Sequence, residues 1–322
     1  MEQLLIELTV LVSMSIAIGI IASMTGISGG AFKTPILIII FALSAELAAA
    51  ASLISACFVA LVGTISYYRQ DSHLIHFRIG ILAAVATIPG SYFGVFLRTI
   101  AAHAHLLQLL FGVILFPIAI RFIFSRSGDK ENANGRSSNV NLSELGVEKQ
   151  VTFVIIAFLA GISAGLLGLG GGTIIVPMLC ILLEFPIIVA AATSMFTMIF
   201  TTLAGSFLNY LIFAQTENLI TFLYFGLIMG LGMILGGVIG PRYASRVNAV
   251  QLQRLFGFLL VFPLIKMMRI GHYLLDPGGS NYLLATIGDG IIWLAIGIPI
   301  WAIASHRMRP DGSENVQGVK HE

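Results

Sequence analysis

Apolar runs of about membrane-spanning length recur along almost the whole chain. A helix needs roughly 20 apolar residues to cross a hydrocarbon core of about 30 Å, and it satisfies its own backbone hydrogen bonds while doing so. Hydrophobic residues make up 57% of the 322 positions and charged residues only 10%, far from the composition of a soluble domain. The sequence therefore predicts an all-α polytopic membrane protein that lies in the lipid bilayer.

The apolar runs form two sets on either side of a polar stretch. The first set covers about 4–22, 31–43, 47–68, 79–98 and 105–124. The second covers about 152–167, 173–184, 187–213, 219–240 and 252–268, and one further run, 282–304, has no counterpart. We therefore expect four parts, namely a first transmembrane repeat over 1–124, a cytoplasmic linker over 125–150, a second repeat over 151–270, and an extra helix with a tail over 271–322.

The two halves repeat one another in sequence. Residues 19–68 and 161–210 align without a gap at a constant offset of 142, with 17 identities in 50 positions. That is about a third, several times what biased composition should give, so one unit was used twice. The identities include Ser52 with Ser194 and Gly63 with Gly205. Later the offset becomes 146, which pairs Gly90 with Gly236.

A glycine-rich interruption stands at the same place in each half. The second half reads Gly-Leu-Gly-Gly-Gly-Thr from Gly168 to Thr173, and Pro177 follows. Its echo in the first half carries Gly26, Gly29 and Gly30, and Pro35 follows. Three consecutive glycines in an apolar run exceed what close packing needs, whereas the glycine pairs four residues apart elsewhere are typical of helix packing. The sequence thus predicts one broken helix per half.

Helices that begin inside a membrane can bind an anion. The first amides of such a helix have no partner within the helix, and its N-terminus carries roughly half a positive charge. We expect the helices starting at about Ala31 and Thr173 to point at one midplane site. Glycines would let a ligand approach the backbone, and hydroxyls would donate to it. The candidate binding residues are Gly26, Ser28, Gly29, Gly30, Lys33, Ser52, Gly168, Gly170, Gly171, Gly172, Thr173 and Ser194.

Two ionisable residues inside apolar runs are further candidates. Lys33 would cost about 3 kcal/mol within a membrane helix, so it should face a cavity and either pair with another group or meet a substrate, or else snorkel to a surface. Its repeat partner is Ile175, so only one half carries this charge. Asp289, in the extra run, could carry a coupling proton. Ser and Thr hydroxyls also bond within their own helix, which is the alternative for Ser52 and Ser194.

The distribution of basic residues favours inverted halves. If each broken stretch is an even pair of segments, such as a hairpin, the Lys and Arg residues divide 13 to 3 between the two sides, with Lys33 uncounted. A single crossing would divide them 9 to 7, which carries no orientation signal. We therefore expect two inverted repeats, each with a glycine-interrupted helix hairpin plus three transmembrane helices. The linker and the C-terminus would be cytoplasmic, and the N-terminus outside.

Other classes of site receive little support from the sequence. A net charge of +2 without a basic block argues against nucleic acid as a partner. Cys57 and Cys180 lie inside apolar runs, as small buried side chains do. No cofactor or metal motif stands out, and the N-terminus has no basic region or cleavage site of a removed signal. A homo-oligomer is left open.

The two glycine stretches resemble the TauE/SafE family of sulfite exporters and related anion permeases. The residues that carry the resemblance are Gly168 to Pro177, their echo Gly26 to Pro35, and the Ala-rich start of each following helix. The resemblance implies movement of sulfur-containing anions, such as sulfite, thiosulfate or sulfonates, across a prokaryotic-type inner membrane. The first copy departs from the family pattern, with Ser28 opposite Gly170 and Lys33 opposite Ile175. These departures leave the particular anion open.

The sequence thus favours a secondary transporter over an enzyme. We expect alternating access at a midplane site between the two broken helices. An anion channel is the nearest alternative. An intramembrane enzyme acting on a lipid-linked substrate is a weaker one, because the apolar runs hold no nucleophile beside a base and no cluster of acids.

Overall fold

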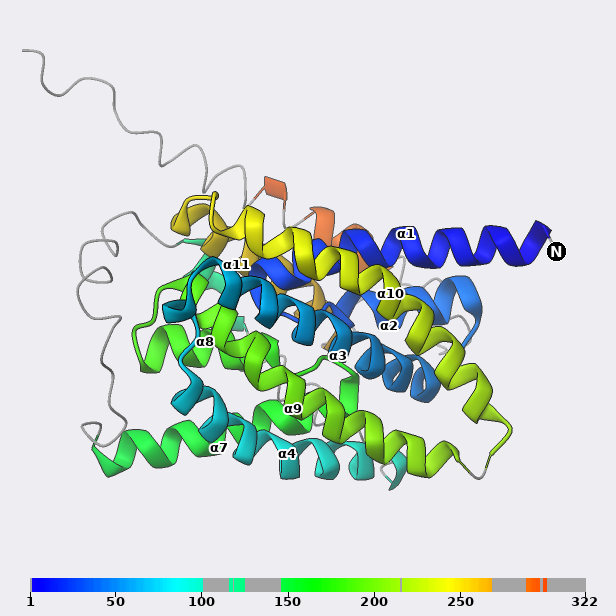
Figure 1. The fold of residues 1–322 in the computed structure, drawn as a ribbon, viewed down its shortest axis with the longest axis horizontal. Helices are drawn as coiled ribbons and strands as arrows, with labels where there is room; N and C mark the ends of the chain where they lie inside the picture. The colour runs from blue at the N-terminus through cyan, green and yellow to red at the C-terminus, as the bar shows by residue number, and fades with distance from the viewer. Residues whose placement is uncertain are drawn as a thin grey trace, which may run out of the picture.

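Every regular element in the described part of the computed structural model is a helix (Figure 1). The structure describes residues 2–100, 116–117, 119–124, 146–214, 216–267, 288–295 and 298–299. The first half contains α1 (Glu2–Thr25), α2 (Gly30–Phe41), α3 (Ala45–Gln70), the 3-10 turn η1 (Ser72–Leu74) and α4 (Phe77–Ile100). The second contains α7 (Val147–Leu167), α8 (Gly172–Leu182), α9 (Ile187–Phe213), α10 (Asn218–Ala244) and α11 (Ala249–Met267). The all-α prediction is confirmed.

Six of these helices are long and apolar enough to cross a membrane, namely α1, α3, α4, α7, α9 and α10. Large apolar side chains cover their outer faces, and Val85, Phe96 and Leu231 are each more than half exposed. Such a surface would be unfavourable in water over so wide an area, but it matches the hydrocarbon of a bilayer. The chain is therefore a multi-pass membrane protein.

Small residues let the long helices pack backbone against backbone. A Cβ added to Gly236 of α10 would lie 2.6 Å from Cα of Gly19 in α1. A Cβ added to Gly161 of α7 would lie 2.9 Å from Cα of Thr87 in α4. Neither position has room for a side chain, so the helix backbones approach each other closely there. Small residues permit this close approach between membrane helices. The glycines spaced by four residues thus join α1 to α10 and α4 to α7.

Helices α3 and α9 run in opposite directions at the centre of the bundle. A Cβ on Gly63 would lie 3.3 Å from Sδ of Met195, and a Cβ on Gly205 would lie 3.1 Å from Cδ1 of Leu53. The early part of each helix therefore meets the late part of the other. The two contacts are also related by the offset of 142, with Gly63 matching Gly205 and Leu53 matching Met195. In Figure 1, correspondingly, α1 begins at the right-hand end of the molecule and α7 at the left-hand end.

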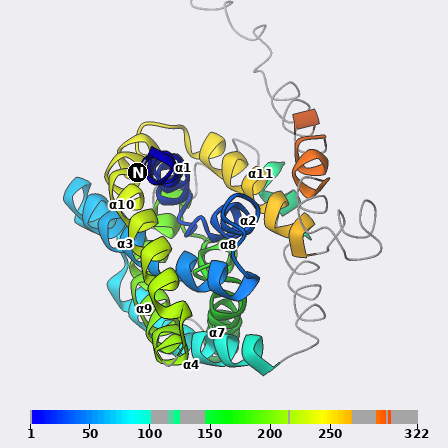
Figure 2. The same cartoon turned by 90° about the vertical axis from the view of Figure 1, so that its right-hand side faces the viewer.

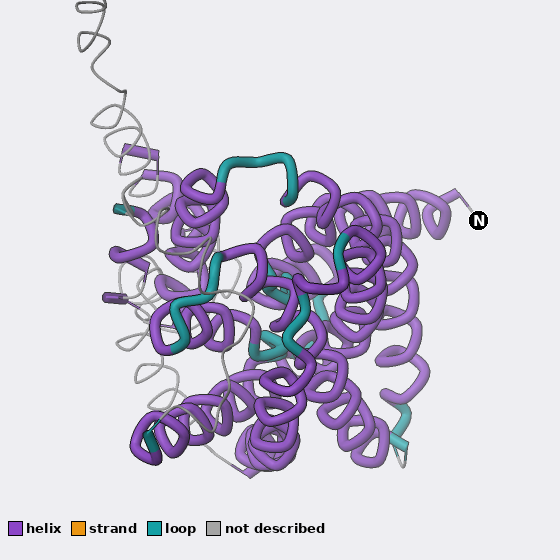
Figure 3. The backbone as a smooth tube through the Cα atoms, turned by 60° about the vertical axis from the view of Figure 1, so that its left-hand side comes forward, coloured by secondary structure: helices purple, strands orange, loops and turns teal. Residues whose placement is uncertain are grey.

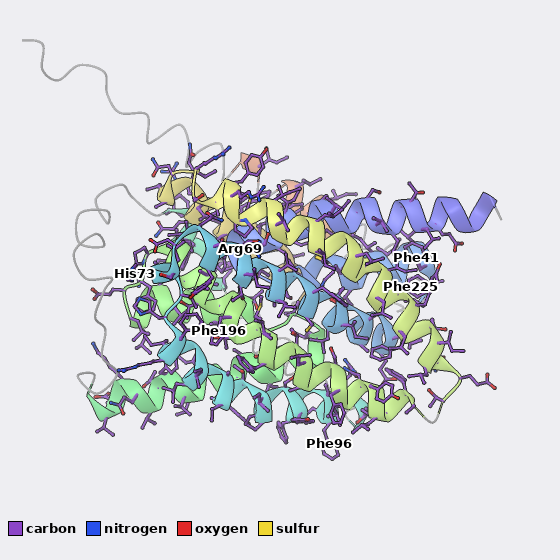
Figure 4. All side chains as sticks on the ribbon, in the orientation of Figure 1. Phe41, Arg69, His73, Phe96, Phe196 and Phe225 are labelled. Atoms are coloured by element: carbon purple, nitrogen blue, oxygen red, sulfur yellow. The ribbon has the colours of Figure 1, made fainter. Side chains whose placement is uncertain are left out.

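Each half begins with a long helix and a short helix joined by a glycine loop. The first loop is Gly26–Gly29 and the second covers Gly168 to Gly171, so α2 and α8 begin one residue before the expected Ala31 and Thr173. Seen along the helices, α2 and α8 lie between the α1 and α10 pair and the α4 and α7 pair (Figure 2). The end of α2 reaches the start of α10, where the rings of Phe41 and Phe225 are 5.2 Å apart (Figure 4).

The turn after each short helix is also the same in both halves. Ala42 and Glu184 are the two non-glycine residues with positive φ, at 52° and 57°, in the described chain. The next amides, of Leu43 and Phe185, donate to the carbonyls of Leu37 and Leu179, which closes a left-handed helix end. Both pairs are 142 positions apart. The repeat found in the sequence is thus a repeat of backbone conformation.

Some boundaries differ from the expectation. Helix α7 begins at Val147, inside the stretch expected as linker, because Gly146 caps it and Glu148 stands in its first turn. The rest of the linker, 125–145, lies outside the described residues, as does most of the run 105–124. Within the extra run, residues 288–295 and 298–299 are helical.

Candidate functional site

The two glycine loops meet in the interior of the bundle (Figure 3). Their residues are buried, and five of their glycines, Gly26, Gly29, Gly168, Gly170 and Gly171, have φ between 66° and 84°. Residues with a side chain rarely adopt that region, so glycine is needed where the chain reverses between the long and the short helix. The expected loops are therefore present at the expected positions.

The glycines next to these turns let one loop touch the other. A Cβ on Gly30 would lie 2.8 Å from the carbonyl carbon of Gly168. A Cβ on Gly172 would lie 3.1 Å from Cα of Ile27. In this structure the partner that these glycines admit is the opposite loop, and their contact with a ligand stays a prediction. The two loops pack against each other, and this contact between the halves cannot be read from the sequence of either half alone.

Serine hydroxyls tie each loop to a helix of the other half. Ser52 Oγ donates to the carbonyl of Gly168 at 3.2 Å, and Ser194 Oγ donates to the carbonyl of Gly26 at 3.0 Å. The two bonds are equivalents under the offset of 142. Ser28 Oγ donates to the carbonyl of Leu169. The structure thus brings all three predicted serines to the loops, with their hydroxyl hydrogens on loop carbonyls, and their contact with a substrate stays a prediction.

Lys33 lies wholly inside the protein, on the first full turn of α2. Its side chain is 0% exposed, so it does not snorkel to the protein surface. The ammonium donates to the carbonyl of Ser52 at 3.0 Å and to Oγ of Ser55 at 2.9 Å. An ammonium has three donors, so one remains. Both recorded acceptors are neutral, and among the described residues no carboxylate balances this charge.

Threonine hydroxyls without a partner lie on both short helices. Thr173, the second residue of α8, is fully buried, and its Oγ1 has no hydrogen-bond partner in the described structure. Thr34 Oγ1, beside Lys33, is also buried without a partner. The first amides of α8 have no acceptor within their own helix. A buried hydroxyl and free amides together are suited to hold an oxyanion.

Proline completes the resemblance between the short helices. Pro35 and Pro177 are each the sixth residue of their helix, slightly deeper than the first turn. A proline has no N–H, so the carbonyl four residues earlier lacks its usual helical donor. Those carbonyls belong to Ala31 and Thr173. Each short helix thus has unsatisfied backbone at its beginning, close to the loops.

The end of the long helix before each loop is held by a side chain that sequence reasoning missed. In the first half, Tyr67 OH donates to the carbonyl of Ser23 at 2.9 Å. In the second half the corresponding carbonyl is that of Gly165, and Arg98 Nη1 donates to it at 3.1 Å. Arg98 also donates to Asn209 Oδ1, and Asn209 occupies the position equivalent to Tyr67. A charged residue at the end of an apolar run was the available signal for Arg98.

Asp289 lies in the described part of the extra run. It is only 4% exposed and has an interaction partner. One turn later, Trp293 packs its ring 5.9 Å from that of Phe32 on α2, and its Nε1 donates to the carbonyl of Phe258 at 3.1 Å. The extra helical segment therefore contacts the short helix that carries Lys33. A coupling role for Asp289 stays a prediction. Within the described residues, no group of three metal-ligating side chains lies together.

Comparison with known proteins identifies the family. Residues 11–267 match the sulfite exporter TauE/SafE family, which is most of the chain and includes both glycine loops. The chain belongs to this family. It is 26% identical over 270 residues to "Probable membrane transporter protein MJ0441" of Methanocaldococcus jannaschii, covering 80% of this chain and 94% of that one. It is 24% identical over 211 residues to "Probable membrane transporter protein YunE" of Bacillus subtilis, covering 61% and 76%.

These matches give the class of activity. The family is described as an exporter and the relatives are named as membrane transporters, so this TauE/SafE protein is a membrane transporter and not an enzyme. A third relative, "Probable membrane transporter protein YjnA" of Bacillus subtilis, is 22% identical over 241 residues, covering 73% of this chain and 91% of its own. No solved structure matches the chain.

Proposed function

We propose that this transporter is a secondary permease or exporter for small sulfur-containing anions such as sulfite, thiosulfate or sulfonates. The family match supports the class of substrate, since the family is described as a sulfite exporter. The observation that carries the proposal is the Lys33 ammonium, which is fully buried and has only the neutral acceptors of Ser52 and Ser55. A buried charge without a counter-charge is unfavourable unless a ligand supplies one. An anion supplies it.

The binding site would lie where α2 and α8 begin. Lys33 donates its third N–H, Thr173 donates its unpartnered hydroxyl, and the first amides of α8 point their dipoles at the bound oxygens. Three oxygens on sulfur present acceptors in several directions, which fits donors converging from different elements. The predicted hydroxyls of Ser28, Ser52 and Ser194 would join the ligand when the loop contacts open.

The mechanism we propose is alternating access between two inverted halves. Support comes from the antiparallel packing of α3 on α9 and from contacts that recur with the halves exchanged, such as Ser52 to Gly168 and Ser194 to Gly26. Equivalent contacts can break on one side while their counterparts hold on the other, which exposes one site to each face in turn. The closely packed loops would then represent an occluded arrangement.

We further propose that the protein resides in the cell's inner membrane with its linker and C-terminus in the cytoplasm and its N-terminus outside. The support is the distribution of charge. Arg69 ends α3 and Arg78 begins α4, and in Figure 4 Arg69 lies at the end of the molecule opposite Phe41. Arg242 lies in the last turn of α10, and helices α10 and α3 end on the same side of the molecule in Figure 1. Clustered basic residues mark the cytoplasmic side.

This function is tested by an uptake experiment in proteoliposomes. The labelled anions are sulfite, thiosulfate and a small sulfonate, each measured with and without a proton gradient. Wild type should take up at least one anion with saturation and should exchange internal unlabelled for external labelled anion. Gly171→Leu should lose uptake, because a branched side chain is strained at φ 84°. Flux that neither saturates nor exchanges would identify a channel instead. Absence of uptake of all three anions by folded protein would withdraw the substrate assignment.

A further inference from the structure

Arg98 reaches from the end of α4 into the last turn of α7, directly before the second glycine loop. Its Nη1 donates to the carbonyl of Gly165 at 3.1 Å, and its Nη2 donates to Oδ1 of Asn209. Its Nε is buried and has no hydrogen-bond partner in the described structure. A guanidinium carries five donors in a planar fork, so this side chain has both a full charge and an unused donor close to the loop.

The charge of Arg98 is not neutralised at short range within the described residues. Both recorded acceptors, the Gly165 carbonyl and the Asn209 amide, are neutral. Glu46, in the first turn of α3, acts on Arg98 electrostatically, but its side chain is exposed and no ion pair joins the two. Solvent and salt weaken the field of an exposed carboxylate. A guanidinium with neutral partners and a free donor is a site for an oxyanion.

The first half shows that holding this carbonyl does not require a charge. Tyr67 OH serves the equivalent carbonyl of Ser23 at 2.9 Å with a neutral hydroxyl. In the second half, Asn209 stands at the equivalent position and could have supplied a neutral donor, yet Arg98 is inserted between Asn209 and the carbonyl. The structural task is the same, so the charge on one side calls for a separate explanation.

Arg98 and Lys33 are connected to the same loop from two directions. Lys33 donates to the carbonyl of Ser52, and Ser52 Oγ donates to the carbonyl of Gly168. Arg98 donates to the carbonyl of Gly165, one turn before Gly168. We propose that Arg98 forms a second binding station for the transported oxyanion, at the end of the molecule where α1 begins, in series with Lys33. Nε–H of Arg98 donates a hydrogen bond to the anion as the anion passes the end of α7.

This inference rests on the proposed function, and one experiment separates the two. The initial rate of labelled sulfite uptake into proteoliposomes is measured against sulfite concentration for wild type, Arg98→Gln, Arg98→Lys and Tyr67→Phe. Removal of a charge-assisted hydrogen bond lowers affinity by about tenfold or more. We expect Arg98→Gln to raise KM by about that factor, Arg98→Lys to raise it less, and Tyr67→Phe to leave KM within about twofold while the maximal rate changes.

Two further variants protect the test against a purely structural effect. Asn209→Ala removes a neutral partner of Arg98 but keeps its charge, so KM should not rise. Glu46→Gln removes the exposed negative charge, so KM should fall slightly. If Arg98→Gln does not fold, Arg98→Lys decides the question, because it keeps the charge and loses the forked donors.

The outcomes are distinct. A raised KM in the Arg98 variants alone supports the second station. An unchanged KM in Arg98→Gln and Arg98→Lys, with wild-type uptake intact, overturns the station and leaves the proposed function standing. Absence of saturable uptake of sulfite, thiosulfate and a small sulfonate by the wild type withdraws both.

Discussion

The two glycine loops share a backbone frame but differ in charge. In both, a glycine admits the opposite loop, a serine of the other half holds a loop carbonyl, and a positive-φ residue ends the short helix. The differences are Lys33 opposite Ile175, and Arg98 with Asn209 in the role of Tyr67. Each loop therefore has one cation close to it, contributed by a different element, and Lys33 is fully buried whereas Arg98 is partly buried. The shared features build the frame, and we propose that the unshared ones bind the anion.

The strongest way to break the shared frame is to add a methyl group where the loops touch. Gly30→Ala should destabilise the protein by about 3 kcal/mol or prevent folding, because its Cβ would overlap the carbonyl group of Gly168 and lie 2.8 Å from the carbonyl carbon. Gly172→Ala should do the same, since it meets the first loop equally closely. Thermal unfolding in detergent measures the loss. Gly146→Ala, with nothing within 4 Å of its Cβ, is the control. A loss of stability in only one of the two loop variants would show that the frame is not shared.

Removing the charge of Lys33 should separate function from stability. Lys33→Met is expected to lose uptake of the transported anion, about a hundredfold in rate at low concentration, because a buried charged partner of the ligand is gone. It should nevertheless unfold at the same or a higher temperature, since an unbalanced buried charge is removed. The free energy of unfolding should rise by up to about 3 kcal/mol. Ser55 Oγ keeps its own acceptor, the Ser52 carbonyl at 2.9 Å.

Ile175→Met is the matched variant of Lys33→Met, since Ile175 is the equivalent and fully buried position. It should leave uptake close to that of wild type. Equal losses of uptake in the two variants would mean that the packing of the short helices matters, rather than the charge.

The two serine ties should contribute equally. Ser52→Ala and Ser194→Ala each remove one hydrogen bond to a loop carbonyl, and each should lower stability by about 1 kcal/mol. Because the two bonds are donated by serines of different halves, the double variant sharpens the comparison. Its loss should exceed the sum if the loops open together, and should equal the sum if they open independently. Chemical denaturation in detergent can resolve these values.

An effect no larger than that of the serine variants is expected at Tyr67. Tyr67→Phe removes the hydroxyl that holds the carbonyl of Ser23 and preserves the ring, so stability should fall by about 0.5–1.5 kcal/mol. Stability is measured as for the glycine variants. A larger loss than for the serine variants would indicate that the end of α1, rather than the loop contact, limits stability.

The sequence predicted the frame because glycine, proline and apolar runs act locally. The glycine loop at Gly168 and the short helix that contains Pro177 follow from residue type and spacing, and most helical boundaries are close to the expected ones. The early start of α7 at Val147 was missed, because the charged residues of its first turn look like linker. The repeat was visible as a constant offset of 142.

The sequence could not show which residues of one half meet the other half. The bonds from Ser52 to Gly168 and from Arg98 to Gly165 join residues 116 and 67 positions apart, and nothing in the spacing indicates them. A repeat relates equivalent residues but does not say that the two copies pack with their loops in contact. The placement of Lys33 against Ser52 and Ser55 likewise depends on how α2 lies on α3.

The most direct measurement of the central claim is the binding of sulfite to purified wild-type protein and to Lys33→Met, by titration calorimetry in detergent, with Ile175→Met beside them. The account predicts saturable binding to wild type and to Ile175→Met, and binding weaker by about a hundredfold to a folded Lys33→Met. Equal binding of sulfite to wild type and to Lys33→Met would contradict it, because the buried ammonium would then not hold the anion.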